Sequence, residues 1–263
     1  MRVLQICNKP PYPPVDGGTL AMNCITQGLL SAGCEVMVFS ACSDKHPVME
    51  HQMTEAYVAD THFDSCYIDL SVRPLDALIA LMCGESYHVK RFDSDDFRTK
   101  LISILKENTF DLIHVESIFL TPYMPTIRKY SSAKVVLRAH NVEHQIWRRV
   151  AESTRNIFKK MYLRHLSLTL RAYECEHIND YDAVACITDA DARMFKSLGC
   201  RKPIIDLPFG IIPDVVDNIS VEENSLFHLG SMDWMPNVEG IEWFIEKVWP
   251  KVHKELPQVH FYL

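Results

Sequence analysis

The sequence predicts an α/β protein built on a doubly wound parallel sheet, and two features of the chain lead to this prediction. Short runs of apolar and β-branched residues alternate with stretches of helical periodicity. Each run is apolar almost without interruption, which is typical of strands covered on both faces, as in parallel sheets. Alternation of this kind predicts right-handed βαβ units and a Rossmann-like first domain.

The predicted strands are residues 2–7, 34–40, 111–115, 133–139, 182–188 and 203–208. Predicted helices cover residues 19–32, 96–106 and 190–198. Gly33 and Gly199 suit the ends of the first and third of these helices, because glycine readily adopts the left-handed conformation there. A longer helical stretch, residues 155–177, interrupts the alternation before the last two strands.

The strand–helix pattern starts again after a polar segment, residues 217–224, which we expect to be a linker. Residues 225–230 predict a new strand, and 259–263 predict another. Between them, apolar residues at 241, 244, 245, 248 and 249 share one helix face. Two strands and one helix bury little core. We therefore expect a first domain at 1–216 and, at 217–263, a linker with only the beginning of a second.

Composition narrows the class of protein. The chain has 263 residues and a net charge of −7, which disfavours binding to nucleic acid. Its nine cysteines form no C-x-x-C pair and mostly lie in apolar runs, as expected of reduced thiols in a cytoplasmic protein. No apolar stretch is long enough for a signal peptide or for a membrane span of roughly 20 residues. We expect a soluble cytoplasmic protein.

One segment departs from the acidic balance of the chain. Residues 145–171 contain seven Lys and Arg residues and a single acid, Glu152. This charge suits either a solvated helix face or contact with an anionic membrane or a diphosphate-bearing lipid.

His140, Glu143 and His144 form an H-x-x-E-H string, which is a zinc-peptidase pattern. Zinc binding by this pattern requires both histidines on one face of one helix. Here His140 ends a β-branched strand, and Asn141 is a natural N-cap for the helix that follows. We therefore predict no metal. Two D-x-D strings, at 93–95 and 189–191, stand at helix starts and are interpreted as caps.

The loops after the strands are the expected ligand sites, because open α/β sheets bind ligands at the carboxyl ends of their strands. Gly17 and Gly18 stand where a proline-rich loop enters the first helix. Glycines there allow backbone N–H groups to approach an anion such as a diphosphate, although a plain loop-to-helix turn explains them equally well. The G-x-G-x-x-G fingerprint of dinucleotide binding is absent from this loop.

The strand of the second unit ends at Gly230, and the following loop is predicted to expose Ser231, Asp233, Trp234 and Asn237. Trp234 suits either a stacking platform or an interface between domains, and the interface is the more common role.

Five segments appear in order: "PPYPPVDGG", "DLIHVES", "RAHNVEH", "LPFGI" and "HLGSMDWMPN". Together they resemble bacterial glycosyltransferases of the GT-B fold, of the family-four-like group that builds surface polysaccharides. The resemblance covers nearly the whole chain. It implies two Rossmann-like domains across a cleft, with the acceptor on the first and the nucleotide sugar on the second. It also implies transfer from a nucleotide-diphosphate sugar, with retention, without metal or cofactor.

The resemblance also implies roles for single residues. His140 would be catalytic and lie against the donor sugar, while the backbone of Gly17 and Gly18 would face the donor diphosphate. Glu116 and Asn141 would line the acceptor side. The residues implied for the donor half are Gly230, Ser231 and Asn237.

Three departures from the family pattern stand out. No basic residue follows Gly230 closely, the hinge reads Phe209-Gly210-Ile211-Ile212 rather than N-G-I-D, and the acidic region for the donor ribose would lie beyond Leu263. Because most of the donor domain would be missing, we expect this chain to be inactive by itself.

The favoured function is sugar transfer to a glycan or lipid-linked acceptor, at the inner face of the membrane. A nucleotide-sugar epimerase or phosphorylase on the same fold is an alternative. A non-catalytic sugar- or nucleotide-binding module is another.

Overall fold

The computed structural model describes residues 1–210, 222–232 and 235–263, and it divides into two units, Met1–Gly210 and Ile211–Leu263. The predicted domain boundary after residue 216 and the first part of the linker lie outside the described residues, as do Ile211 and Ile212 of the hinge motif. Each unit is described by itself below.

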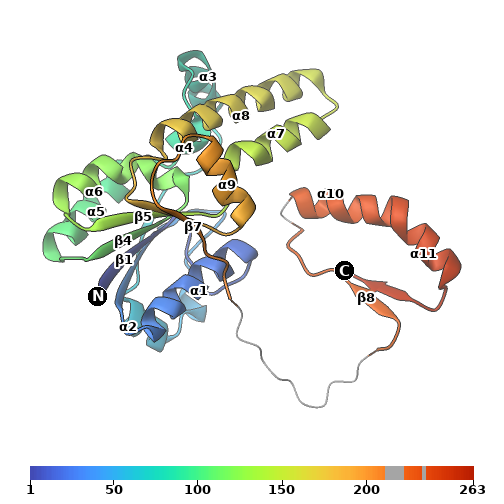
Figure 1. Cartoon of the computed structure of the whole chain (residues 1–263), viewed down its shortest axis with the longest axis horizontal. Helices are drawn as coiled ribbons and strands as arrows, with labels where there is room; N and C mark the ends of the chain where they lie inside the picture. The colour runs from blue at the N-terminus through green and yellow to red at the C-terminus, as the bar shows by residue number, and fades with distance from the viewer. Residues whose placement is uncertain (211–221, 233–234) are drawn as a thin grey trace. The chain divides into compact units, whose positions relative to one another are not determined.

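The first unit is built around a parallel seven-stranded sheet of order β3-β2-β1-β4-β5-β6-β7 (Figure 1). Its strands are β1 Arg2–Cys7, β2 Glu35–Cys42, β3 Asp64–Tyr67, β4 Leu112–Glu116, β5 Lys134–Ala139, β6 Ala183–Cys186 and β7 Ile204–Asp206. The chain moves outward from β1 in one direction and then from β4 in the other, which is the Rossmann strand order. The predicted doubly wound α/β fold is confirmed, and its switch point lies between β1 and β4.

Helices connect the strands and cover the sheet. They are α1 Gly17–Ser31, α2 Glu55–Thr61, α3 Pro74–Cys83, α4 Tyr87–Lys90, α5 Asp95–Glu107, α6 Met124–Tyr130, α7 Glu143–Ser153, α8 Ile157–His177 and α9 Asp189–Ser197, with 3-10 turns at Glu50–Gln52 and Ile118–Tyr123. In Figure 1, α5 and α6 lie on one face of the sheet, and α1 and α2 on the other. Strands covered on both faces bury nearly every side chain, and β1 is buried from Val3 to Cys7.

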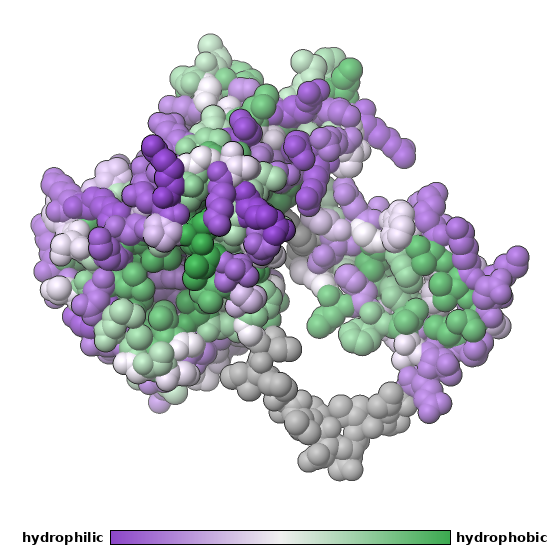
Figure 2. Space-filling view, viewed as in Figure 1, coloured by the Kyte–Doolittle hydropathy of each residue, from purple (hydrophilic) through white to green (hydrophobic). Residues whose placement is uncertain are grey.

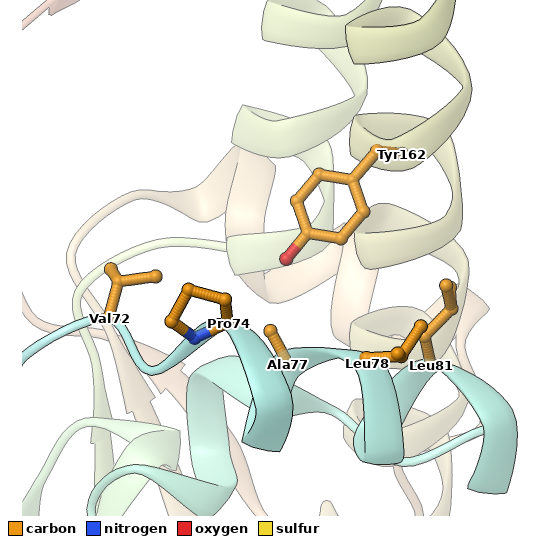
Figure 3. A pocket seen from close by; sticks show the side chains of 6 residues that line it. All are labelled: Val72, Pro74, Ala77, Leu78, Leu81 and Tyr162. Atoms are coloured by element: carbon orange, nitrogen blue, oxygen red, sulfur yellow. The ribbon is translucent and has the colours of Figure 1, made fainter.

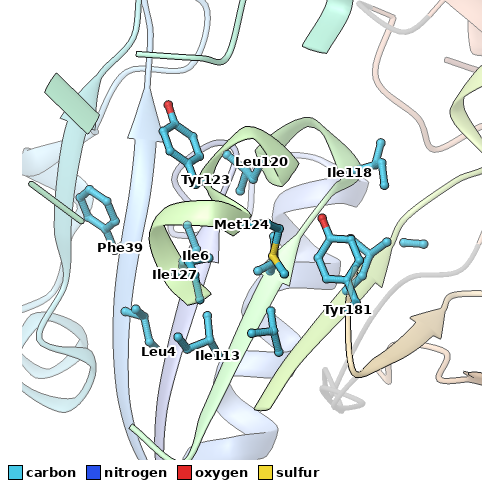
Figure 4. Packing of buried hydrophobic residues seen from close by; sticks show 14 of the residues in the cluster. Leu4, Ile6, Phe39, Ile113, Ile118, Leu120, Tyr123, Met124, Ile127 and Tyr181 are labelled. Atoms are coloured by element: carbon cyan, nitrogen blue, oxygen red, sulfur yellow. The ribbon is translucent and has the colours of Figure 1, made fainter. Parts of the chain in front are cut away.

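The main core lies between the sheet and the segment that follows β4. Figure 4 shows Ile6 of β1 and Ile113 of β4 packed with Met124 and Ile127 of α6. Tyr123 is also fully buried, and its ring packs against Phe97 of α5, with ring centroids 4.6 Å apart. This packing fixes the position of β4, and so of the residues at its carboxyl end.

The second unit contains a pair of parallel strands, β8 Ser225–Phe227 and β9 His260–Tyr262. Between them run α10 Met235–Trp243, a π-helical turn Phe244–Val248 and α11 Trp249–Glu255. Phe261 of β9 packs against the rings of Phe244 and Trp249, at 4.8 and 5.6 Å between centroids. The strands and helix predicted for this part of the chain are therefore present, although both strands are shorter than predicted.

Candidate functional site

Three neighbouring strands of the first unit, β1, β4 and β5, bring polar side chains to one edge of the sheet. Glu116 is the last residue of β4, and His140 follows directly after β5. Both lie at carboxyl ends of parallel strands beside the switch point, where this class of sheet binds its ligands.

The carboxylate of Glu116 is fully buried and holds the ring of His140. Nε2 of His140 lies 2.8 Å from Oε2 of Glu116, while Oε1 accepts a hydrogen bond of 2.7 Å from the amide of Gln5. Nε2 of His114 lies 3.1 Å from the same Oε1. Burial alone would raise the pKa of Glu116, but the two neighbouring histidines hold this pKa well below its usual range. Glu116 is therefore a buried carboxylate anion.

An ionised carboxylate only accepts hydrogen bonds, so the ring nitrogen of His140 that faces Glu116 carries a proton. Nδ1 is then the nitrogen left to act outside this pair. The side chain of His140 keeps an exposure of 13%, whereas that of Glu116 has none. The side chain of His140 can therefore contact a ligand, whereas Glu116 can affect a ligand only through His140.

The polar cluster extends from Glu116 into α1. The amide oxygen of Gln5 accepts a 2.6 Å hydrogen bond from Thr26, and the amide nitrogen of Gln5 lies 3.1 Å from the backbone oxygen of Met22. Thr26 and Met22 both belong to α1, which starts at the glycine loop. The strand ends and the first helix are thus joined by one buried network.

Arg138 is a buried cation on the neighbouring strand. It stands opposite Glu116 in the register of β4 with β5, and its Nη1 donates to the backbone oxygen of Cys186 at 3.1 Å. Nε and Nη2 have no hydrogen-bond partner among the described residues. Burial lowers the pKa of Arg138, and the nearby Glu116 charge opposes this shift.

Sequence reasoning did not single out Gln5, His114 or Arg138. Each is a polar residue between apolar neighbours in a strand, "RVLQIC", "LIHVE" or "KVVLRA". Because a buried polar side chain needs a partner, this interruption was a usable signal for a buried polar cluster.

The predicted glycine loop enters α1 two residues earlier than expected, so that Gly17 and Gly18 form the first turn of the helix. Asp16 caps this turn, accepting a 2.8 Å bond from the N–H of Thr19, and pairs with Lys9 at 2.6 Å. Burial would raise the pKa of Asp16, but Lys9 and Thr19 lower it. A Cβ at Gly18 would lie 3.1 Å from Nζ of Lys9, whereas a Cβ at Gly17 would meet nothing within 4 Å.

The three residues predicted for the donor half lie together in the second unit, after β8. A Cβ at Gly230 would lie 2.7 Å from Nε2 of His228 and 2.8 Å from Nδ2 of Asn237, so any larger residue there would displace these two side chains. The same amide of Asn237 donates to the backbone oxygen of Ser231 at 2.9 Å. Asp233 and Trp234 lie outside the described residues.

The H-x-x-E-H string is divided between two structural elements. His140 precedes α7, which begins at Glu143, so the two histidines do not share a helix. The predicted N-cap role of Asn141 is wrong. Glu174 of α8 reaches across instead, accepting from the N–H of Glu143 at 2.8 Å and pairing with the ring of His144. Asn141 is exposed beside His140.

The two D-x-D strings do stand at helix starts. Ser94 of the first accepts a 3.4 Å bond from the N–H of Phe97 in α5. Thr188, directly before the second string, accepts a 3.1 Å bond from the N–H of Asp191 in α9. No group of three or more potential metal ligands occurs among the residues that the structure describes.

Glu143 leads to a prediction about pH. Burial and the charge of Glu174 raise its pKa from 4.5 to about 8. The folded chain therefore keeps a proton that the unfolded chain has lost, and the stability that this gives below pH 4.5 is lost as the pH rises through about 8. Glu143→Gln, which stays neutral, is expected to raise the free energy of unfolding by about 1 kcal/mol at pH 8 and to change it little at pH 4.

Urea denaturation of both proteins at the two pH values measures this difference. Glu176→Gln, at an exposed position on α8, is the matched control and is expected to have no pH-dependent effect. Equal stabilities of the Glu143→Gln and wild-type chains at pH 8 would contradict the raised pKa.

Comparison with known protein families gives a match over most of the chain. The family model described as Glycosyltransferase Family 4 matches residues 16–215, more than half of the chain, including both glycines, Glu116 and His140. No match was found among the curated proteins.

Two solved structures show similarity at low identity. Sucrose-phosphate synthase from Thermosynechococcus elongatus is 10% identical, with a TM-score of 0.47, over 79% of this chain and 89% of that one. Phytolacca americana UGT2, complexed with UDP-2fluoro-glucose and pterostilbene, is 10% identical, with a TM-score of 0.49, over 100% of this chain and 71% of that one. The family match, rather than these similarities, carries the assignment.

Proposed function

Because the chain belongs to Glycosyltransferase Family 4, we propose that it moves a sugar from a nucleotide-diphosphate donor to a glycan or lipid-linked acceptor, in the synthesis of a surface polysaccharide. We propose that transfer retains the anomeric configuration and needs no metal. The observation that carries the proposal is His140, held by the buried Glu116 carboxylate at the edge of the sheet beside the switch point.

In such a transfer, the bond from the anomeric carbon to the diphosphate oxygen breaks, a bond to the acceptor oxygen forms, and the proton of the acceptor hydroxyl passes to the departing diphosphate. The anomeric carbon gains positive charge while the diphosphate gains negative charge. We assign to His140 the contact with the sugar in this transition state. Glu116 is a positioning residue, because its carboxylate has no exposed surface and fixes the ring of His140.

The diphosphate needs neutralisation, and the β1–α1 loop offers it. The first-turn N–H groups at Gly17 and Gly18 lie at the positive end of α1, and Lys9 lies beside them. Asp16 holds the ammonium of Lys9 at this helix start, in a pair that has no net charge. We assign Lys9 to the diphosphate, for which it would exchange Asp16, because no basic residue follows Gly230 closely.

We assign the remaining site residues to the acceptor side or to the donor side. Asn141, exposed beside His140, would contact the acceptor, while Gly230, Ser231 and Asn237 would bind the donor. Residues 1–216 would form the acceptor domain, and 217–263 would belong to the donor domain.

We also propose that the protein works at the cytoplasmic face of a membrane, where lipid-linked acceptors are presented. Among the described residues, no helix is long and apolar enough to cross a membrane. We assign the contact with the membrane to the basic segment at 145–171, whose seven Lys and Arg residues suit anionic headgroups.

Because the 263-residue chain is expected to be inactive by itself, the test is incubation of the protein purified from its natural source with a panel of nucleotide sugars and with lipid-linked and free glycan acceptors, followed by mass spectrometry. A product heavier than the acceptor by one sugar supports the proposal. A changed nucleotide sugar with no transfer would indicate an epimerase instead. Binding without any change of donor or acceptor would indicate a sugar-binding module.

Substitution at Gly18 tests the role of the loop. In protein that transfers sugar, Gly18→Val is expected to weaken donor binding by roughly tenfold and also to lower kcat, because a β-branched side chain would block approach of the diphosphate to the backbone. Gly28→Val is the control, because Gly28 lies further along α1 and a Cβ there meets nothing within 4 Å. Donor titration by calorimetry measures the difference, and equal affinities for both variants would argue against a diphosphate at Gly18.

A further inference from the structure

The helix α3 is apolar nearly throughout and yet largely exposed. Of its ten residues, "PLDALIALMC", only Ala80 is buried, while Leu75 and Met82 are 75% and 80% exposed. A helix that is apolar on all sides is normally buried in a core or in lipid. In Figure 2, hydrophobic atoms gather over this part of the first unit.

The first half of α8 continues the exposed apolar area. Phe158 is 80% exposed, and Ile157 and Met161 are exposed as well. Tyr162 of α8 faces α3 across a shallow groove of about 360 Å³ (Figure 3). The groove is lined by Val72, Pro74, Ala77, Leu78, Leu81 and Tyr162. We call the exposed set the apolar surface; it consists of Leu75, Leu78, Ile79, Met82, Ile157, Phe158 and Met161.

The apolar surface is fixed to the rest of the unit. Ala80 packs in a separate small core with Tyr87, Val150, Leu163 and other residues of α4, α7 and α8. Ala77, which is partly buried, packs against the same small core. Packing of the buried alanine face therefore fixes the orientation of α3. Its large apolar side chains are exposed on a helix that is held in place, not on a flexible loop.

Cations border the apolar surface. Arg155, Lys159 and Arg164 are exposed on and just before α8, interleaved with its apolar residues. They belong to the segment with seven basic residues and one acid, in a chain whose net charge is −7. Exposed apolar side chains with a basic rim are the pattern of interfacial membrane helices.

We propose that α3 and the first half of α8 form a membrane-docking surface, which inserts its apolar side chains into the headgroup–acyl boundary of an anionic bilayer while the basic rim contacts the headgroups. This inference deepens the proposed function, on which it rests, since it names the apolar surface rather than charge as the main source of attachment. The charge complementarity favours an anionic bilayer over a second copy of this acidic chain.

Attachment by insertion differs measurably from attachment by charge alone. Electrostatic contact weakens in salt, because exposed charges are screened beyond roughly 3 Å at 1 M. Insertion of apolar side chains persists in salt, since it depends on surface removed from water.

The experiment is flotation of the 263-residue chain with vesicles of phosphatidylcholine alone, or of phosphatidylcholine with phosphatidylglycerol, at low and high salt. We expect binding to the anionic vesicles that is reduced, but not abolished, by salt. The triple variant Leu75→Gln, Met82→Gln, Phe158→Gln is expected to bind at least about 100-fold more weakly. Lys159→Gln with Arg164→Gln is expected to cost roughly fivefold for each charge.

Val58→Gln is the matched control, because Val58 is an exposed apolar residue on α2. Circular dichroism of every variant checks the fold, which surface changes of this kind leave intact. Cys83, the exposed cysteine at the end of α3, also allows a polarity-sensitive thiol probe, whose emission should shift to the blue when vesicles bind. Cys83→Ser is expected to lose this signal.

Unchanged vesicle binding by the triple variant would overturn the inference. A wild-type chain that ignores vesicles but forms a dimer, which the triple variant dissociates, would also overturn it and assign the surface to a second copy. Sugar transfer to a soluble acceptor is measured separately. The glycosyltransferase assignment therefore stands or falls independently of these outcomes.

Discussion

Replacing His140 with alanine, in protein that transfers sugar, is expected to lower kcat by about 100- to 1,000-fold and to change donor affinity little. The reason lies in where the ring is held. Glu116 fixes it at the strand edge before any substrate arrives, so its interaction with the developing charge needs no reorganisation. A group that acts mainly in the transition state affects kcat more than binding of the donor.

Steady-state kinetics with varied donor measures this effect, and calorimetry gives the donor Kd separately. His177→Ala is the matched control, because His177 also pairs with a carboxylate, Asp180 at 2.7 Å, but at the end of α8. That variant should transfer sugar at the wild-type rate. If His140→Ala does so too, the assignment of His140 is wrong.

Much of this arrangement was predictable from sequence, because strand ends and family motifs coincide. The resemblance to family-four-like glycosyltransferases is confirmed by the family match over residues 16–215. The six predicted strands are all present, since short and nearly continuous apolar runs bounded by polar residues form buried parallel strands. Their carboxyl ends then placed Glu116 and His140 at one edge of the sheet.

Burial at that edge was not predictable. Glu116 was expected to line the acceptor side, whereas in the structure its carboxylate has no exposed surface and contacts the ring of His140. A polar residue at a strand end faces either the ligand or the interior. Which of the two it faces depends on the polar side chains that surround it in the folded chain. Here Gln5 and His114 come from separate parts of the chain, and the strand register brings them within reach.

Short elements escaped prediction for a different reason. One strand of the sheet, β3, was not predicted. It is only four residues long and contains no aliphatic side chain. The helix α3 shows no alternation of apolar and polar faces, because both of its sides are apolar. The cap of α7 was missed because Glu174 reaches it from 31 residues further along the chain.

The buried polar cluster around Glu116 should also contribute strongly to the free energy of unfolding of the first unit. Glu116→Ala is expected to lower the free energy of unfolding by about 3–5 kcal/mol at pH 7, because it leaves Gln5, His114 and Arg138 buried with a missing partner or countercharge. Glu116→Gln keeps the shape and one acceptor, so its cost should be smaller, about 1–3 kcal/mol.

The pH dependence separates the charge of Glu116 from its shape. Its pKa is lowered in the folded chain from the ordinary value of 4.5, so its contribution is fully present above pH 4.5 and is lost as the pH falls towards the folded-state pKa. The stability difference between wild type and Glu116→Gln should therefore shrink as the pH falls below about 4.5. Urea denaturation followed by circular dichroism measures it, with Glu152→Gln, an exposed carboxylate, as the control expected to cost less than about 0.5 kcal/mol. A difference that stays constant down to pH 3 would mean that the geometry of Glu116, rather than its charge, stabilises the cluster, and His140 would then owe its position to packing alone.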